Sequence, residues 1–249
     1  MAAEPIPIPP RPAGSAVEPL SQGARIVDTF IAPSKTFNDL HRSASWWAPW
    51  LLMAIVGLMF VYAMDRQVTF EQITKNEIAR SPRAEQFDKL PADQRAQQLR
   101  IGTSFTRYIS YSTPVIQLLV FLIVAGVLMG TFNLAAGASV PFKIALATVI
   151  YGSLPTVIGG LLGIVALFAG VDAEGFNVRN PVATNPAYFM DPSGNKFLYS
   201  MASALDVFVL WSIILIGIGF AANSKVKRGT AIVIVLAWYL VYKMVGGAF

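Results

Sequence analysis

The stretch SALDVFVLWSIILIGIGFAA (203–222), NSKVKRG (223–229) and TAIVIVLAWYLVYKMVGGAF (230–249) decides the fold. Each of its two apolar runs is long enough to cross about 30 Å of hydrocarbon as a helix that rises about 1.5 Å per residue. Only a short polar turn joins the two runs. The stretch therefore predicts a transmembrane helical hairpin.

The turn of this hairpin also predicts the orientation of the chain. It carries three cations, Lys225, Lys227 and Arg228, and short loops rich in Lys and Arg stay on the cytoplasmic side. We therefore expect a cytoplasmic N-terminus and an extracytoplasmic C-terminus. The 65–113 connection, on the outer side in this arrangement, has many cations too, but acids balance them, and a folded segment is a weaker signal than a short turn.

The composition indicates the same class of protein. Hydrophobic residues make up 55% of the 249-residue chain, charged residues make up 13%, and the mean hydropathy is +0.55, which is far from the soluble balance. The apolar runs are continuous and about twice as long as β-barrel strands, so we expect an all-α polytopic membrane protein. The absence of cysteine from the sequence excludes disulfides, thiolate metal sites and palmitoylation. The net charge of +5 suits contact with anionic lipid headgroups. The sequence has no basic patch with interleaved aromatic residues of the kind that would indicate binding of nucleic acid.

Five transmembrane helices are expected, with two longer connections between them. The 65–113 connection mixes acids and bases and has Ser-Pro and Leu-Pro breaks, so we expect a small helical extracytoplasmic cap. The 170–202 connection is rich in Asn, Asp, Pro and Gly, which is typical of an irregular loop. In the second span, Gly126 and Gly130 form a small-xxx-small step that favours close approach of a neighbouring helix. The expected spans are 46–64, 114–136, 141–169, 203–222 and 230–249.

The chain before the first span divides into two parts. Residues 1–23 are rich in Pro and are expected to form a disordered tail, which leaves 24–249 as the membrane domain. The segment 24–40 has an amphipathic pattern with a proline in its middle, so we expect it to lie on the cytoplasmic surface, with packing against the bundle as the alternative. Tryptophans that open the first span suit the headgroup layer. The residues assigned to this interfacial segment are Phe30, Pro33, Phe37, Trp46 and Trp47.

Few polar residues lie inside the apolar runs. Asp206 is the one acid within any expected span, and an isolated charge there is costly, so it needs a partner. In an antiparallel hairpin Asp206 and Lys243 have similar depth, which predicts an ion pair between them; Tyr111 and Gln117 are the alternative partners. Lys143 lies near a helix start and can reach the headgroups. The candidate intramembrane polar and packing sites are Asp206, Lys243, Lys143, Asn133, Pro155, which is expected to kink the third span, and Trp211.

Several short stretches of the chain resemble the Yip1 domain family. They are IVDTFIAPSKTF (26–37), WWAP (46–49), NLAAG (133–137), FK (142–143), YGSLP (151–155) and LDVF (205–208) with Trp211 and Ile216-Gly217. The resemblance implies a five-span membrane protein of a kind found in the eukaryotic secretory pathway and in bacteria. The Asp-Leu-Tyr-Gly-Pro signature and the long acidic tail of eukaryotic members are missing, so Rab GTPase binding is not carried over. The outer loop and the Pro-rich start are similar to bacterial members, some of which are associated with exporters, and this implies an inner-membrane location.

The residues favour a role without catalysis. The single histidine, His41, lies outside the spans, no His-Glu-x-x-His motif is present, and Ser153 lacks the second glycine of a nucleophile elbow. No cofactor is expected. The rival hypothesis is a transporter, because Asp206 and Lys243 offer intramembrane charge, but five spans do not divide into equal inverted halves. The leading hypothesis is a scaffold or partner subunit that lies in the lipid bilayer and binds other integral membrane proteins or further copies of itself.

Overall fold

A computed structural model describes residues 19–248, and every regular element in that range is a helix. The prediction of an all-α polytopic membrane protein is confirmed. Residues 1–18 of the expected tail lie outside the described residues, and Gln22 and Gly23 already belong to the first helix.

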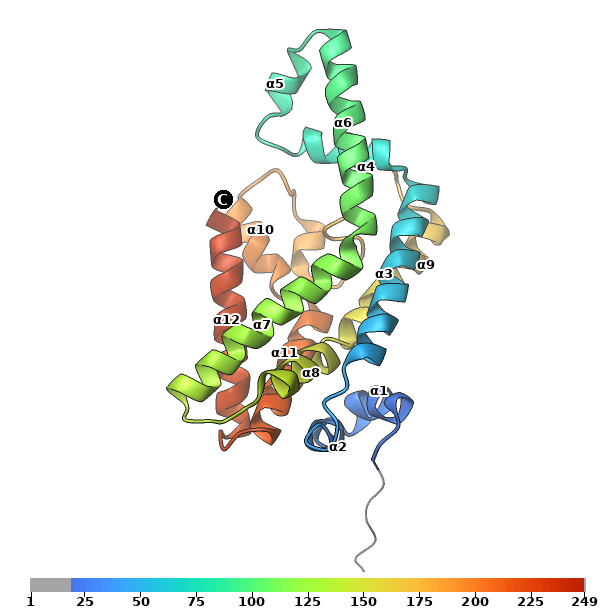
Figure 1. Ribbon diagram of the computed structural model, residues 1–249. Helices are drawn as coiled ribbons and strands as arrows, with labels where there is room; N and C mark the ends of the chain where they lie inside the picture. The colour runs from blue at the N-terminus through green and yellow to red at the C-terminus, as the bar shows by residue number, and fades with distance from the viewer. Residues whose placement is uncertain (1–18, 249) are drawn as a thin grey trace, which may run out of the picture.

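Long apolar helices form a bundle (Figure 1). Within the described residues, four are long and apolar enough to cross a membrane: α3 (Trp47–Gln67), α7 (Thr113–Ala135), the pair α8 (Phe142–Gly152) and α9 (Pro155–Gly170), and α12 (Arg228–Ala248). A fifth crossing results if α10 (Lys196–Ser203) and α11 (Val207–Ala222), which are bent by 59° at the break between them, form one span.

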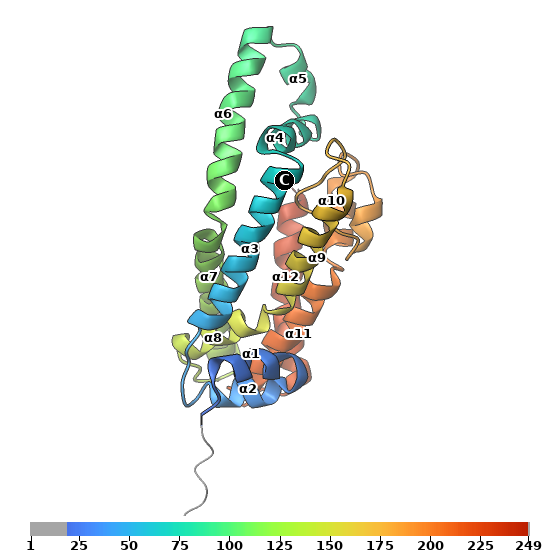
Figure 2. The same cartoon turned by 90° about the vertical axis from the view of Figure 1, so that its right-hand side faces the viewer.

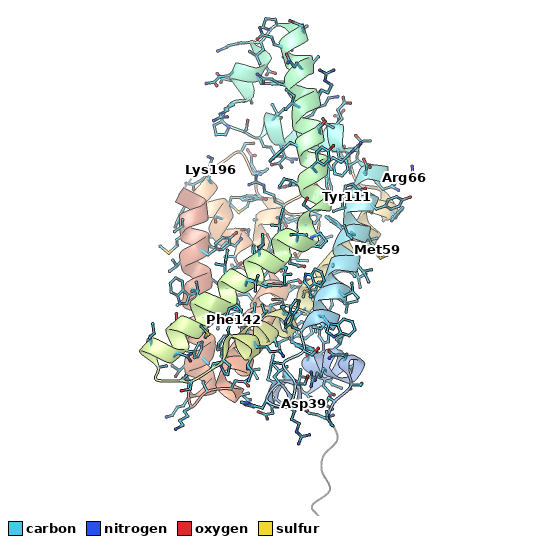
Figure 3. The ribbon with its side chains drawn as sticks, in the orientation of Figure 1. Asp39, Met59, Arg66, Tyr111, Phe142 and Lys196 are labelled. Carbon is cyan, nitrogen blue, oxygen red and sulfur yellow. The ribbon has the colours of Figure 1, made fainter. Side chains whose placement is uncertain are left out.

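Shorter helices lie at the two ends of this bundle (Figures 1 and 2). At one end, which we call the basal end, are α1 (Gln22–Ile31) and α2 (Pro33–Asp39). At the opposite end, α4 (Phe70–Ala79), α5 (Ala84–Asp88) and α6 (Ala92–Tyr111) form the α4–α6 cap. The helix α6 leads directly into α7, and Tyr111 marks the junction (Figure 3). The 170–202 connection is not irregular throughout, because it contains the short helix η1 (Pro186–Phe189) and most of α10.

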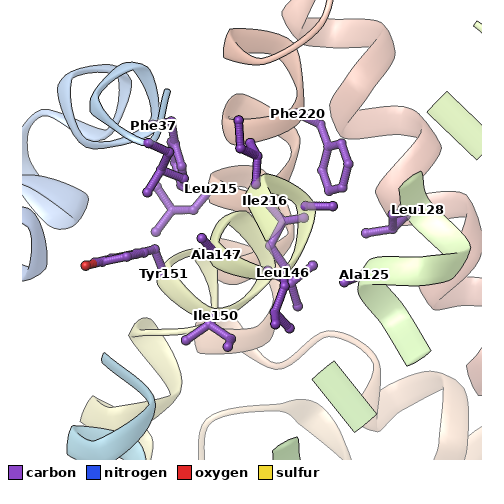
Figure 4. Close-up of a cluster of buried hydrophobic side chains, with 14 of the residues drawn as sticks. Phe37, Ala125, Leu128, Leu146, Ala147, Ile150, Tyr151, Leu215, Ile216 and Phe220 are labelled. Carbon is purple, nitrogen blue, oxygen red and sulfur yellow. The ribbon is translucent and has the colours of Figure 1, made fainter. Parts of the chain in front are cut away.

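The helix α11 lies inside the bundle and contacts α2, α8, α9 and α12. Glycines allow these contacts to be close. A Cβ added at Gly217 would lie 2.6 Å from the Ile232 Cα, and one at Gly219 would lie 2.4 Å from the Thr148 Cγ2, so neither position has room for a side chain. Nearby, the buried Phe220 ring belongs to the apolar cluster shown in Figure 4, which joins α2, α7, α8 and α11.

Glycines also set the contact between α9 and α3, but not the contacts of α7. A Cβ at Gly163 would lie 2.7 Å from the Phe60 ring, whereas a Cβ at Gly126 or Gly130 would meet nothing within 4 Å. For contacts within the described chain, the small-xxx-small prediction for the second span is therefore wrong. The reason is that α7 turns a different face, which includes the fully buried Ala125, toward its neighbours.

The 24–40 segment packs against the bundle, which is the alternative that the sequence left open. The Phe37 side chain is fully buried, and the Phe30 ring meets the Trp211 ring edge to face with 5.6 Å between centroids. By contrast, Ile31 is 75% exposed. An exposed apolar side chain at this end of a membrane bundle suits the headgroup layer.

Candidate functional site

The break between α10 and α11 is the main departure from a plain helical bundle. Asp206 has an extended backbone (φ −64°, ψ 125°) and is the N-cap of α11, because its carboxylate accepts hydrogen bonds from the backbone N–H groups of Phe208 (3.0 Å) and Val209 (3.1 Å). Aspartate is among the preferred N-cap residues and is stabilised by the helix dipole. Within the expected span 203–222 the helix therefore begins only at Val207, since α10 ends at Ser203 and α11 starts after Asp206.

The second carboxylate oxygen of Asp206 holds the 170–202 connection. It accepts hydrogen bonds from the Thr184 hydroxyl and, at 3.4 Å, from the Asn185 amide. The Val207 N–H donates to the Thr184 carbonyl at 3.2 Å, and Asn185 and Asn180 exchange two amide hydrogen bonds of 2.9 and 3.2 Å. The carboxylate accepts four hydrogen bonds in all, which fills its acceptor sites.

Lys243 has partners other than the predicted one. Its ammonium donates to the Ser203 hydroxyl at 2.9 Å and lies 5.8 Å from the centre of the Tyr239 ring, and its carbonyl accepts from the Ser200 hydroxyl at 2.9 Å. It thus ties α12 to α10. The predicted ion pair with Asp206 is not among those formed within residues 19–248.

The alternative partners proposed for Asp206 are also wrong. Tyr111 meets the Phe70 ring edge to face, with 5.9 Å between centroids, and neither it nor Gln117 bonds to the carboxylate. The physical reason is local, because backbone N–H groups at the start of α11 lie within reach of the short aspartate side chain before any distant group does.

A small pocket of about 200 Å³ lies beside this break. Its wall includes Phe60 from α3, Gly159 and Gly160 from α9, and Phe208 from α11, with Asp206 at its polar side. Within residues 19–248, no group of three or more His, Asp and Glu side chains is placed to hold a metal ion. The arrangement offers a small apolar recess next to one carboxylate whose oxygens are already engaged.

The other candidate residues do not gather at Asp206. Asn133 closes the turn between α7 and α8, because its amide donates to the Val140 carbonyl (3.0 Å) and its oxygen accepts from the Val140 N–H (2.9 Å). Lys143 is exposed in the first turn of α8, and Pro155 is buried at the first position of α9. These three residues shape the α7–α9 region and lie on other elements than the break.

The aromatic residues expected at the interface serve two purposes. Trp46 meets Trp50 edge to face with 6.3 Å between centroids, and the Trp50 indole donates to the Pro114 carbonyl at 3.3 Å, which joins α3 to α7. Trp47 is 55% exposed and keeps the position of an interfacial anchor. Pro33 begins α2 and accounts for the break in the amphipathic segment.

A buried ion pair at the basal end was missed by the sequence analysis. Arg25 on α1 is 1% exposed; its Nε donates to an Asp39 carboxylate oxygen at 2.8 Å, and a terminal nitrogen lies 2.6 Å from the same oxygen. The other terminal nitrogen donates to the Ser43 carbonyl at 2.8 Å, and the Arg25 carbonyl accepts hydrogen bonds from Thr29 and Thr36. The pair locks α1, α2 and the chain before α3 together.

Comparisons with known proteins give one match. A family model described as the Yip1 domain matches residues 27–248, which covers the whole bundle and the α4–α6 cap. No curated protein and no solved structure matches the chain.

Proposed function

Because the chain belongs to the Yip1 domain family, a membrane protein family associated with trafficking, we propose that it acts as a non-catalytic scaffold or partner subunit for other membrane proteins in an exporter or trafficking complex. The proposed location is the inner membrane, with the basal end on the cytoplasmic side. The α11–α12 turn with Lys225 and Lys227 supports this orientation.

The observation that carries the proposal is an uncovered apolar row on the α4–α6 cap. Ile101, Phe105 and Tyr108 follow one another at helical spacing on α6, and their exposed fractions are 60%, 65% and 75%. We call these three residues the α6 stripe. The helix α6 is not among the apolar spans, and it extends beyond the ends of α3 and α12 (Figures 1 and 2), so we propose that the stripe lies outside the hydrocarbon layer. Apolar patches that face water mark contact sites for proteins.

Co-purification tests this proposal. The full chain, solubilised mildly from its own membrane, is expected to retain a membrane protein in fixed stoichiometry, and a variant with Ile101→Ser and Phe105→Ser is expected to lose it. Leu198→Ser is the matched control, because Leu198 is 56% exposed on α10, away from the stripe. Loss of the partner in the control alone, or retention in both variants, would contradict the proposal.

A transporter is the second candidate, and the break beside Asp206 is the observation that favours it. Discontinuous helices and charged residues within spans are common at the binding sites of transporters. Purified protein in liposomes decides between the two functions. Movement of a solute or an ion by the chain alone, abolished by Asp206→Asn in a protein of unchanged thermal stability, would replace the scaffold proposal by transport.

A further inference from the structure

A groove of about 430 Å³ runs along a second face of α6 in the α4–α6 cap. Arg100, Thr103, Ser104 and Arg107 follow one another along its wall at helical spacing, and Glu71 from α4 lies at its edge. Apolar side chains, among them those of Leu99 and Tyr108, complete the lining. The groove thus combines two arginines and two hydroxyl-bearing residues with apolar side chains, and it lies on the α4–α6 cap.

The two arginines have donors to spare. The Arg100 guanidinium is exposed and forms no hydrogen bond or ion pair with any residue of 19–248. Arg107 lies 3.9 Å from the Asp65 carboxylate and 5.4 Å from the centre of the Phe70 ring, which holds it near the base of the cap. Glu71 is paired with Lys75 at 2.6 Å and Arg107 has the Asp65 carboxylate nearby, so Arg100 is the lining charge that no described acid balances. The groove therefore favours an anion.

A hydroxyl between the two cations has no partner. The Thr103 Oγ1 is buried and forms no hydrogen bond with a described residue. Buried polar groups in folded proteins are nearly always paired, and an unpaired one is destabilising. Thr103 lines the groove, but its hydroxyl oxygen is enclosed by protein atoms, so the arginines are the groups that can contact a ligand.

The spacing of the cations indicates the shape of the anion. Arg100 and Arg107 are seven residues apart on the helix, or about 10.5 Å along its axis. A single phosphate or carboxylate is much shorter than this, and Arg107 is held in place by its neighbours. In a peptide in the polyproline II conformation, which has three residues per turn and rises about 3.1 Å per residue, side chains three residues apart lie on the same face, about 9 Å apart. Guanidinium groups bind carboxylates with charge-assisted hydrogen bonds.

We propose that this groove binds an acidic segment of a partner protein in the polyproline II conformation, with carboxylates three residues apart on Arg100 and Arg107. The inference rests on the proposed partner-subunit function, because it specifies the chemistry of the partner at the cap. Tyr108 belongs both to the groove and to the α6 stripe, so a partner seated in the groove also covers part of the stripe.

A direct binding measurement tests this inference. The full chain in nanodiscs of uncharged lipid is titrated against a fluorescein-labelled peptide, Glu-Leu-Ala-Glu-Leu-Ala-Glu, and binding is followed by anisotropy. Arg100→Gln is expected to raise the Kd by about tenfold, since a hydrogen bond to a charged group is lost. Arg95→Gln is the matched control, because Arg95 is an exposed cation of the same helix that does not line the groove. A peptide with Gln in place of Glu is expected to bind as weakly to the native chain.

Each contrary result has a definite meaning. Equal weakening of peptide binding by Arg95→Gln and Arg100→Gln would show that binding responds to net charge, and it would overturn the assignment of the peptide to the groove. Displacement of the peptide by inorganic phosphate, added at the same total concentration of negative charge as the peptide, would assign the site to a small anion. It would overturn the proposal of an acidic segment. Failure of the native chain to bind the peptide would overturn the inference too, while co-purification of a membrane partner would still support the scaffold function.

Discussion

The buried pair of Arg25 and Asp39 allows a quantitative prediction about the basal end. In Asp39→Asn the side chain keeps its shape but loses its charge. Arg25, which is only 1% exposed, is then left without a counter-ion. Removal of one partner of a buried ion pair costs about 3–5 kcal/mol. The pair joins α1 to α2, so we expect this cost to fall on the docking of these two helices.

The expected loss of free energy can be measured as faster hydrogen exchange in α1 and α2. A loss of 3–5 kcal/mol corresponds to about a hundredfold to a few thousandfold increase in the population of the open state. Hydrogen exchange of the backbone amides in α1 and α2, measured on the solubilised protein, is expected to accelerate by that factor where exchange follows local opening. Amides of α3 are expected to change much less.

Two further variants make the reasoning refutable. Arg42→Gln removes the positive charge of an arginine that lies 3.9 Å from Asp39 but is 47% exposed, so we expect at most about a fivefold change in exchange. The double variant Arg25→Met with Asp39→Leu removes both charges, and we expect it to recover most of the protection, because replacing a whole buried pair by apolar groups is often neutral. Equal effects of Asp39→Asn and Arg42→Gln would refute the assignment of the stability to the buried pair.

Three further predictions concern packing, the break and the orientation. Gly217→Ala is expected to lower the thermal midpoint of the solubilised protein by the equivalent of about 1–3 kcal/mol, because the new Cβ would lie 2.6 Å from the backbone of α12, whereas Gly57→Ala, with nothing within 4 Å, should leave the midpoint unchanged. Asp206→Ala is expected to lower the midpoint by the equivalent of about 1–3 kcal/mol, since it removes a helix cap and leaves loop donors unpaired; an unchanged midpoint would argue against a stabilising role of the Asp206 hydrogen bonds between α11 and the 170–202 connection. A single cysteine at Gln86 should react with a membrane-impermeant maleimide in intact cells and one at Ser224 should not, and the reverse pattern would invert the proposed orientation.

The class of the fold could be predicted from the sequence because it depends on long-range averages. Apolar runs of about twenty residues have few stable arrangements in a bilayer other than helices, and the all-α membrane class was confirmed. The family could be recognised from short stretches in a fixed order, and the family model confirmed it. Both inferences draw on many residues at once, so a local error does not change them.

The details that depend on one side chain could not be predicted in the same way. A hydropathy average over 203–222 hides a break at Asp206, although an aspartate before a helical run is itself an N-cap signal. Arg25 and Asp39 are fourteen residues apart, and they meet only because α1 and α2 turn back on each other. From the sequence, each of these two charges reads as part of a solvated face.

The charged groups beside the break and in the groove of the cap differ in how far they are paired within residues 19–248. Asp206 accepts four hydrogen bonds, and Lys243 donates to Ser203, so their chemistry is used to hold helices and loops together. In the cap, Arg100 makes no bond with a described residue, and the Thr103 hydroxyl is buried without one. An unpaired buried hydroxyl also occurs at Thr148 within the bundle, so it is the unpaired Arg100 cation that supports a contact on α6 with something outside the chain.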